Sequence, residues 1–552
     1  MYSSEPLHHF VEQYLAYLHE TYPTDAALDG VHLHDDLLED LSRQAIDAQI
    51  RSLAGFSRRL DQIRLEGLTP TEQVEHPVAA SSIRSRLFEL EEVRSWERSP
   101  QYYAGLLASS LAAQVVFDYA PVEERARRIL SKLRQVPRFV GSARDNIKEP
   151  PGIFVKVGLE TLRGVLKFVE TDLPKALTDV DDLHLLGDLA DASMEAADAL
   201  RSYIDYLERE VAPRARASFR LGREKFEQKL KLDEGIGLNS DRLQSIVLRA
   251  LGETAEEFRR TAGRLGPGDP IENWRGIKRR HPPAGGLVEE ARRQIDELRT
   301  FIERQDLVSI PDEQPVIVAP TPDFYRWSFA SMWTPGPFES RRPRAYYFVT
   351  DVEPSWPPER QEEHLLDFNY QTLWAISMHE VYPGHFVQYQ HMRGVEAKLR
   401  KSVLFAPTSF VEGWAHYGEQ MMIEAGFGRE DPAIRLGQLA EVLIRLVRAV
   451  VSIRLHAEDM SVEQGVRLFR DEAYMEESSA RREAERGTFD PAYGVYALGR
   501  LMFVKLRADY KAAQEARFSP RAFHDAVLSQ GSVPLWALRQ LLLGRHSGDI
   551  LE

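Results

Sequence analysis

The sequence of 552 residues contains no cysteine. A disulfide scaffold, a thiolate zinc site, an iron–sulfur cluster and a cysteine nucleophile are therefore excluded, because each of them needs a thiol or a thiolate. A transition metal bound by this chain would need histidine, aspartate and glutamate side chains as its ligands.

Long apolar runs are lacking as well. Nowhere do about 18 uncharged apolar residues follow one another, and the start MYSSEPLHHFVEQYL lacks a basic segment followed by an apolar core. We therefore expect a cytoplasmic protein without a membrane partner.

Positive charge is in deficit. The 70 lysines and arginines face 85 aspartates and glutamates, which gives a net charge of −15. This balance disfavours nucleic acid as a partner, because a phosphate backbone attracts cationic surfaces. The expected partner is a small substrate, and the sequence leaves the oligomeric state open between a monomer and a homodimer.

The hydrophobic pattern predicts a mainly α fold. Apolar residues recur every three or four positions from Leu7 to about Leu265, and the same pattern returns from Arg360 to the end. Between these regions, the runs Pro315–Ala319 and Ala345–Thr350 are typical of strands, so we expect a small β-sheet within about residues 315–350. We predict an N-terminal helical region, residues 1–265, and a catalytic region, residues 266–552, in one continuous body with Gly266–Gly286 as the best linker candidate.

Histidines gather in one window. Residues 378–417 hold four of the sixteen histidines, and His379 is followed directly by Glu380 and six positions later by His385. Glu412 follows 27 residues after His385. Two histidines, a glutamate beside the first and a downstream glutamate are the components of a His₂Glu zinc hydrolase, in which the metal-bound water loses its proton to a nearby base. We expect a single Zn²⁺ per chain and assign Glu380 as the general base.

The spacing of the two histidines needs an irregular backbone. Ligands six positions apart on a regular helix point about 120° away from each other. Pro383 has no N–H group to donate to the carbonyl of His379, and Gly384 tolerates unusual dihedral angles. The Pro-Gly pair is therefore expected to kink or bulge the helix and turn His385 back towards His379.

Other histidines offer alternatives. His416 lies four residues after Glu412, which is a regular ligand spacing on a helix, so this pair rivals the first set, or His416 fixes Glu412 from behind. A second polar group, His32, His34, Asp35 and Asp36, resembles a metal site in composition, but such runs at loop starts are usually caps.

The motif resembles a known family. The run from His379 to Gln388 followed by Glu-Gly-Trp-Ala at residues 412–415 is similar to the bacterial family called domain of unknown function 885, which is thought to be zincin-like and related in fold to carboxypeptidase Taq and angiotensin-converting enzyme. Further matching segments, in chain order, are Tyr22-Pro23, Ala26-Ala27, Gly30-Val31-His32, Pro100-Gln101-Tyr102-Tyr103, Arg342-Pro343-Arg344-Ala345-Tyr346-Tyr347, and Glu483, Arg486, Pro491, Tyr496 and Gly499. The resemblance therefore extends over essentially the whole chain.

The resemblance implies roles for individual residues. It implies zinc on His379, His385 and Glu412, with Glu380 as the base, in a deep cleft of a helical body of which residues 1–265 form one side. It further implies that Tyr496 stabilises the oxyanion, that Arg486 binds a substrate carboxylate, and that strand Ala345–Thr350 is the edge strand along which an extended substrate lies. The chain departs from the family pattern at His416 and Tyr493. Further candidates are, around the metal, Gln388 and Glu419, and, for substrate contact, Tyr346, Tyr347, Tyr382 and Tyr493.

The sequence as a whole favours a gluzincin-like, zinc-dependent hydrolase that cleaves an amide bond of short peptides, in a carboxypeptidase-like manner if Arg486 binds a terminal carboxylate. The second hypothesis is a metal-dependent hydrolase of a small non-peptide metabolite, because fold and motif do not select the substrate. The third hypothesis is a non-catalytic helical binding protein. The presence of Glu380 argues against it, because a purely structural zinc site would not need that carboxylate.

Overall fold

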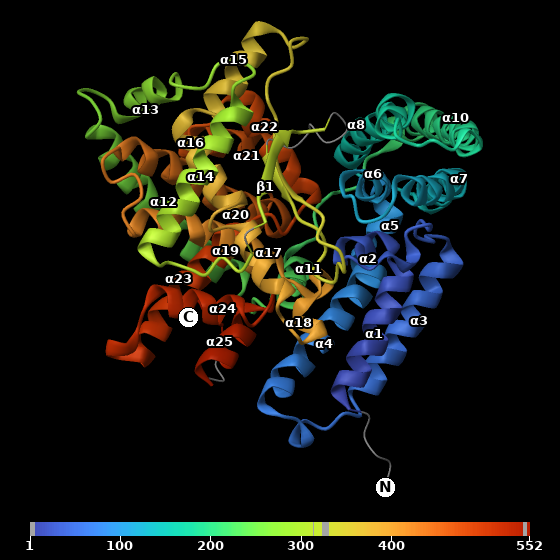
Figure 1. Ribbon diagram of the computed structural model, residues 1–552, viewed down its shortest axis with the longest axis horizontal. Helices are drawn as coiled ribbons and strands as arrows, with labels where there is room; N and C mark the ends of the chain where they lie inside the picture. The colour runs from blue at the N-terminus through green and yellow to red at the C-terminus, as the bar shows by residue number, and fades with distance from the viewer. Residues whose placement is uncertain (1–5, 313, 323–329, 545–548) are drawn as a thin grey trace. The chain divides into compact units, whose positions relative to one another are not determined.

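The computed structural model describes residues 6–312, 314–322, 330–544 and 549–552, and these residues form a mainly helical fold with a small sheet, as predicted (Figure 1). The chain divides into two compact units. Unit 1 comprises Met1–Phe219, Pro335–Arg344 and Ala397–Phe405, and unit 2 comprises Arg220–Thr334, Ala345–Glu396 and Ala406–Glu552. The first division thus falls between Phe219 and Arg220, whereas the composition of the sequence pointed to residue 265.

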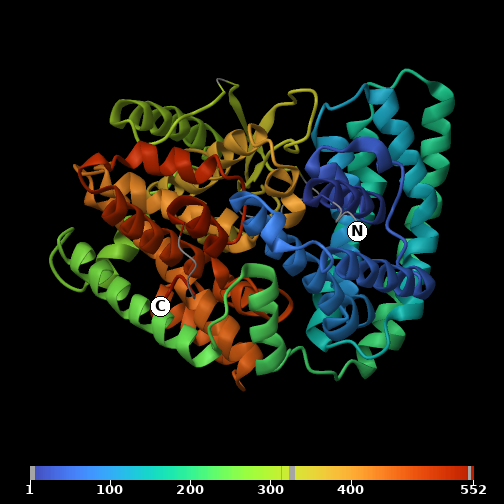
Figure 2. The same cartoon turned by 90° about the horizontal axis from the view of Figure 1, so that it is seen from below.

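Unit 1 is helical. Its α-helices are α1 (Leu7–Thr21), α2 (Pro23–Asp29), α3 (Arg43–Leu60), α4 (Pro70–Phe88), α5 (Ser95–Arg98), α6 (Pro100–Val116), α7 (Val122–Asn146), α8 (Gly152–Lys167), α9 (Leu173–Ala176), α10 (Leu183–Tyr206) and α18 (Lys398–Lys401). The long helices α7 and α10 lie side by side in both Figure 1 and Figure 2.

A buried aspartate joins the three separate segments of unit 1. The Asp29 side chain is fully buried and accepts hydrogen bonds from Ser402 Oγ at 2.5 Å and from the backbone N–H of Val403 at 2.8 Å. Its backbone carbonyl accepts the N–H of Phe338 at 2.9 Å. Since a buried carboxylate must be hydrogen-bonded to be tolerated, these contacts fix residues 335–344 and 397–405 to α2.

Unit 2 contains the sheet and the remaining helices. The helices are α11 (Arg223–Lys229), α12 (Ser240–Gly263), α13 (Pro270–Lys278), α14 (Leu287–Gln305), α15 (Pro358–Asp367), α16 (Tyr370–Glu380), α17 (His385–Arg393), α19 (Thr408–Glu424), α20 (Pro432–Ala457), α21 (Val462–Ala473), α22 (Glu477–Phe489), α23 (Val495–Gln514), α24 (Pro520–Leu528) and α25 (Leu535–Leu543). A single π-helical turn, η7 (Leu230–Glu234), follows α11.

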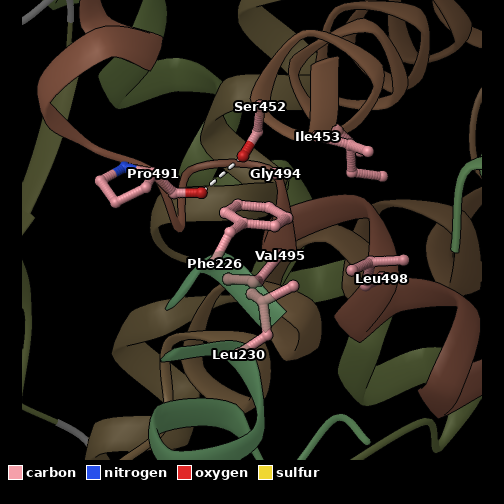
Figure 3. A pocket seen from close by; sticks show the side chains of 9 residues that line it. Phe226, Leu230, Ser452, Ile453, Pro491, Gly494, Val495 and Leu498 are labelled. Atoms are coloured by element: carbon pink, nitrogen blue, oxygen red, sulfur yellow. Dashed lines mark hydrogen bonds between the residues drawn. The ribbon is translucent and has the colours of Figure 1, made fainter. Parts of the chain in front are cut away.

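Helix α20 forms the centre of unit 2. It is buried along most of its length, as expected for a helix that is apolar on nearly every side, and it packs against α12, α16, α21, α22 and α23. Phe226 of α11 and Leu230 of η7 face Ile453 of α20 and Val495 of α23 around a small apolar cavity (Figure 3). This packing joins the first segment of unit 2 to helices that follow more than 200 residues later.

The sheet has three strands in the order β1-β3-β2. Strand β1 (Val316–Pro320) pairs in parallel with β3 (Ala345–Val349), and β2 (Ala330–Trp333) pairs antiparallel with β3, so that Met332 lies opposite Tyr347. Both predicted strands are confirmed. The expectation that residues 345–350 form an edge strand is wrong, because β3 has a strand on each side.

Two glycines allow α19 and α23 to pack at very short range. A Cβ atom added to Gly499 would lie 2.1 Å from the carbonyl oxygen of Ser409, and one added to Gly413 would lie 2.7 Å from the backbone of Gly499. No other residue fits at these positions without moving one helix, since real Cβ contacts are much longer.

We expect Gly499→Ala to destabilise the protein by about 1–3 kcal/mol, because the added methyl group overpacks the contact between α19 and α23. Thermal unfolding followed by circular dichroism measures the effect. The matched control is Gly252→Ala on α12, where an added Cβ meets nothing within 4 Å and alanine favours the helix by about 0.5–1 kcal/mol. Equal melting temperatures for the two variants would contradict the close packing of these helices.

Candidate metal centre

A break between two helices brings the histidines of the motif together. Helix α16 ends at Glu380 and α17 begins at His385, so the chain forms two helices where the sequence predicted one distorted helix. The N–H of Gly384 donates to the carbonyl of Met378 at 3.0 Å, and a Cβ atom on Gly384 would lie 1.6 Å from the carbonyl oxygen of His379. Only glycine can approach so closely. The imidazole rings of His379 and His385 consequently lie 4.8 Å apart, nearly perpendicular to each other.

Glu412 completes the cluster. It lies in the second turn of α19, and its Oε2 atom lies 3.2 Å from His379 Nε2 and 3.5 Å from His385 Nε2. One ligand atom from each of the three residues lies within 4.8 Å of the others, and this is the group of potential metal ligands found among the described residues. These are the three residues that the sequence predicted.

A carboxylate behind His379 sets the orientation of its ring. His379 Nδ1 lies 2.9 Å from Oε1 of Glu419, which is fully buried on α19. Because a carboxylate can only accept, Nδ1 carries a proton, which leaves Nε2, on the Glu412 side of the ring, as the nitrogen that would bind a metal. Arg445 of α20 in turn donates to Glu419 at 3.2 Å and to Glu441 at 2.9 Å, which compensates the charge of the buried carboxylates.

The electrostatics of the cluster favour a bound cation. Burial raises the pKa of Glu412, but the charge of His385 and the hydrogen bonds from both histidines outweigh it and hold that pKa well below its usual range. Burial and the charge of Arg445 lower the pKa of His379, whereas hydrogen bonds to Glu412 and Glu419 raise it to a net value of about 9. Without a metal, the two carboxylates thus attract a proton to the position between them.

Glu380 is held beside the cluster by the sheet. It is the last residue of α16, and its Oε2 atom accepts the backbone N–H of Met332 on β2 at 2.8 Å. The hydroxyl group of Tyr347 lies 3.3 Å from Oγ of Ser377, one turn before Glu380 on α16, and is fully buried. Tyr347 therefore packs β3 against α16, whereas Tyr346 lies on the opposite face of the sheet, where its ring stacks on Phe348.

Tyr496 and Arg486 lie together next to α20. Burial and the charge of Glu412 raise the pKa of Tyr496 to about 12, against the charges of Arg486 and Arg448. The guanidinium group of Arg486 donates to Tyr496 Oη at 3.3 Å and twice to Asp490, at 2.9 and 3.1 Å. The guanidinium group that was predicted to bind a substrate carboxylate is thus paired with the carboxylate of Asp490 in the same chain.

Three further candidates occupy packing positions. Gln388 donates to Ser532 Oγ at 2.8 Å and is buried there, so it does not orient His385. Tyr382 is buried beside Phe386, with ring centroids 5.8 Å apart. Tyr493 is also fully buried, and a Cβ atom on Gly487 would lie 2.5 Å from its hydroxyl group.

The rival ligand sets are not formed. His416 is fully buried on α19, but the cluster of ligand atoms among the described residues does not include it. Burial, together with the charges of Arg445 and Arg500, lowers its pKa well below the usual value, so His416 is neutral.

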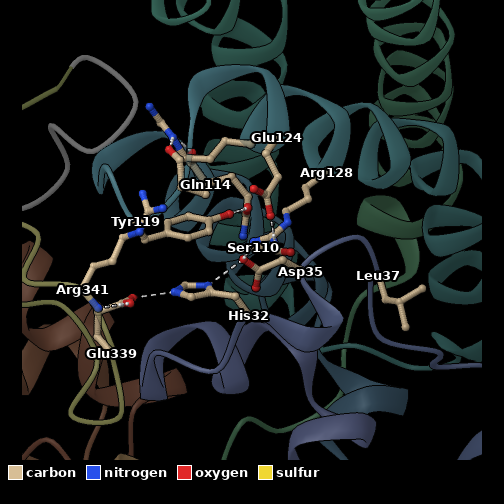
Figure 4. Close-up of polar contacts among 12 residues, drawn as sticks. His32, Asp35, Leu37, Ser110, Gln114, Tyr119, Glu124, Arg128, Glu339 and Arg341 are labelled. Carbon is tan, nitrogen blue, oxygen red and sulfur yellow. Dashed lines mark hydrogen bonds and ion pairs between the residues drawn. The ribbon is translucent and has the colours of Figure 1, made fainter.

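The second polar group is an ion-pair network. His32 Nδ1 lies 2.7 Å from Asp35 and Nε2 lies 2.6 Å from Glu339, so the two carboxylates face opposite sides of the ring (Figure 4). The ring also stacks on Tyr119 at 3.7 Å, and Arg128 donates to Asp35 at 3.1 Å. Because its two carboxylates lie on opposite sides of the ring, this group does not bring three ligand atoms to one point, and it is not a potential metal cluster of the described residues.

Two partners of the centre were missed by the sequence analysis. One is Arg445, whose signal was its place, together with Arg448, within the otherwise apolar run Val442–Val451 of α20. The other is the backbone of Met332, for which the sequence carries no signal, because a backbone N–H group is common to nearly all residues.

Comparisons with known proteins agree with this architecture. A structure described as a putative lipoprotein of unknown function from Shewanella oneidensis is 26% identical over 98% of this chain and 100% of its own, with a TM-score of 0.80. A putative lipoprotein from Colwellia psychrerythraea is 18% identical over 97% of this chain and 98% of its own, with a TM-score of 0.82, and shows the same fold. No curated protein matches the chain.

The comparisons correct one prediction and identify the family. The predicted cytoplasmic location is contradicted, because both similar structures are described as lipoproteins. Among the described residues, no helix is long and apolar enough to cross a membrane. The family of bacterial proteins of unknown function DUF885 matches residues 23–542, and the chain belongs to this family.

Proposed function

We propose that the protein is a zinc-dependent hydrolase that cleaves an amide bond, most specifically the peptide bond of short peptides. The observation that carries the proposal is the convergence of His379, His385 and Glu412 on one point with Glu380 beside them. A purely structural zinc site would not need the fourth residue, Glu380, because structural sites are closed by their ligands.

The donor set fits zinc. Two imidazole nitrogens and one carboxylate oxygen are the ligands of a catalytic zinc ion with one position left for water, and the bond from His379 Nδ1 to Glu419 is the outer-shell contact that such histidines usually make. When bound, zinc supplies a Lewis acid and lowers the pKa of a coordinated water molecule towards about 7.

Glu380 is suited to move the proton. Its carboxylate is kept in one orientation by the N–H of Met332, and the other oxygen can accept the proton of the attacking water. The same carboxyl group then delivers that proton to the leaving amine. Strand β2 is one of the two outer strands of the three described, and it is the one whose backbone holds Glu380, so β2 takes the place of β3 as the strand beside which an extended substrate would lie.

Tyr496 is suited to donate to the oxyanion. With a pKa of about 12 it remains protonated at neutral pH, and its O–H group is available as a donor. Arg486 lies against this hydroxyl group and is neutralised by Asp490, so we assign it to placing Tyr496 and not to binding a substrate carboxylate.

Metal content is the first test. Elemental analysis of purified protein supplied with zinc is expected to give about one zinc per chain, the metal being lost in His385→Ala and kept in His416→Gln. The reverse result for the two variants would restore His416 as a ligand. A wild-type chain without tightly bound metal would exclude the proposed reaction.

Glu419→Gln is expected to weaken zinc binding about 10- to 100-fold, because the amide no longer fixes the protonated Nδ1 of His379 as strongly. Competition with a chromophoric chelator measures the affinity. Glu424→Gln, on the same helix but more than three turns beyond Glu412 and paired with Arg507, is the matched control. Equal affinities for the two variants would mean that Glu419 does not orient the ligand.

Glu380→Gln is expected to retain zinc and to lower kcat about 10²- to 10⁴-fold, and Tyr496→Phe to lower it about 10²- to 10³-fold. The assay is a screen of free and blocked dipeptides beside small non-peptide amides, followed by chromatography of the products. Hydrolysis of a small amide alone would change the substrate class but keep the mechanism. Hydrolysis at the same rate by Glu380→Gln and wild type would exclude Glu380 as the base.

A further inference from the structure

The helix that carries Glu412 and Glu419 begins without a cap of its own. The residue before the first turn of α19 is Pro407, and no side chain within this turn accepts the N–H group of Ser409. Ser409 is fully buried, so water cannot satisfy this N–H group either. A helix start in this position needs an acceptor from another part of the chain.

Glu234 supplies the acceptor. Its Oε2 atom accepts the N–H of Ser409 at 2.7 Å across a separation of 175 residues. Glu234 is itself buried, with 3% of its surface exposed, at the end of η7. Leu230, the first residue of η7, packs against α20 and α23, and this contact fixes the position of the Glu234 carboxyl group at the other end of the turn (Figure 3).

The same turn of α19 is held on its other side. The carbonyl group of Ser409 lies against Gly499 of α23, with no room for a methyl group between them. The backbone of Ser409 is thus fixed at its N–H by Glu234 and at its carbonyl by Gly499. Glu412 follows three residues later, in the same regular helix, so its place depends on the place of this turn.

The charge of Glu234 strengthens its contact with the N-terminal end of α19. Burial raises the pKa of Glu234 to about 7, against the hydrogen bonds from Ser409, while Asp233 raises it and Lys229 lowers it. Asp233 and Lys229 compensate each other in an ion pair at 2.8 Å. The carboxyl group accepts the N–H of Ser409 in either protonation state, and its anionic form is additionally stabilised by the N-terminal end of the helix.

We propose that Glu234 is a positioning residue for the metal centre, which holds the first turn of α19 and so places Glu412 opposite His379 and His385. This inference rests on the proposed zinc site, but the contact itself exists in the metal-free chain. Glu234 binds neither metal nor substrate.

The experiment compares Glu234→Ala, Glu234→Gln and Leu251→Ala with the wild type. Leu251→Ala removes a buried side chain of α12, which packs along α20, and serves as a control for general destabilisation. Zinc affinity is measured by chelator competition below the melting temperature of each variant. We expect Glu234→Ala to bind zinc about 10- to 100-fold more weakly, as for other outer-shell losses, and Glu234→Gln, which keeps an acceptor, to stay within about threefold of the wild type.

Hydrogen exchange of the metal-free proteins provides a second measurement. The peptide that covers the first two turns of α19 is expected to exchange faster in Glu234→Ala than in Leu251→Ala at comparable melting temperature. If Glu234→Ala and Leu251→Ala match in both measurements, Glu234 has only a general structural role and the inference is overturned. If the wild type binds no zinc, the proposed function fails, and hydrogen exchange alone decides whether Glu234 holds the helix.

Discussion

The short contact between Gly384 and the carbonyl oxygen of His379 is the constraint on which the metal centre depends. It lets the chain end one helix at Glu380 and start another at His385 within four residues, and it sets the two rings nearly at right angles. A side chain at residue 384 would push α17 away, and the two histidines would then lie too far apart to face one carboxylate. The positions of His379 and His385 are therefore set by the backbone and do not depend on contacts between side chains.

The second half of the centre is helix α19, which carries Glu412 and Glu419, and here side-chain charges set the geometry. Helix α19 combines Gly413, which permits the close contact with Gly499 of α23, with buried carboxylates whose charge needs compensation. Arg445 compensates Glu419, and His379 links the two halves through both of its nitrogens. Buried charges of this kind add little net stability, since desolvation offsets their attraction, so their value lies in fixing one arrangement. The buried charges of this centre thus contribute to the geometry of the ligands more than to the stability of the fold.

The sequence was informative where the signal was local. The helical periodicity and the strands β1 and β3 follow from patterns within a few residues, and the three ligands stand in two short motifs, one with His379 and His385 and one with Glu412. Each of these was predicted. The order of the strands was not, because β2 has only four residues and its pairing is non-local. For the same reason Glu234, 175 residues before its partner, gave no signal. The sequence offered His416 as a rival ligand and Gln388 as a residue beside the metal, whereas His416 stays outside the ligand cluster of the described residues and Gln388 is hydrogen-bonded to Ser532.

The construction of unit 1 from three separate segments has a consequence for synthesis on the ribosome. When its first 219 residues have emerged, Asp29 still lacks Ser402 and Val403, and His32 still lacks Glu339. Those partners are translated only with the sheet and the first metal-binding helices of unit 2. The polar core of the N-terminal helices therefore stays incomplete while roughly 180 further residues are translated. At about 5–20 residues per second, this translation takes some 10–40 seconds. An isolated N-terminal fragment would remain in this unfinished state permanently.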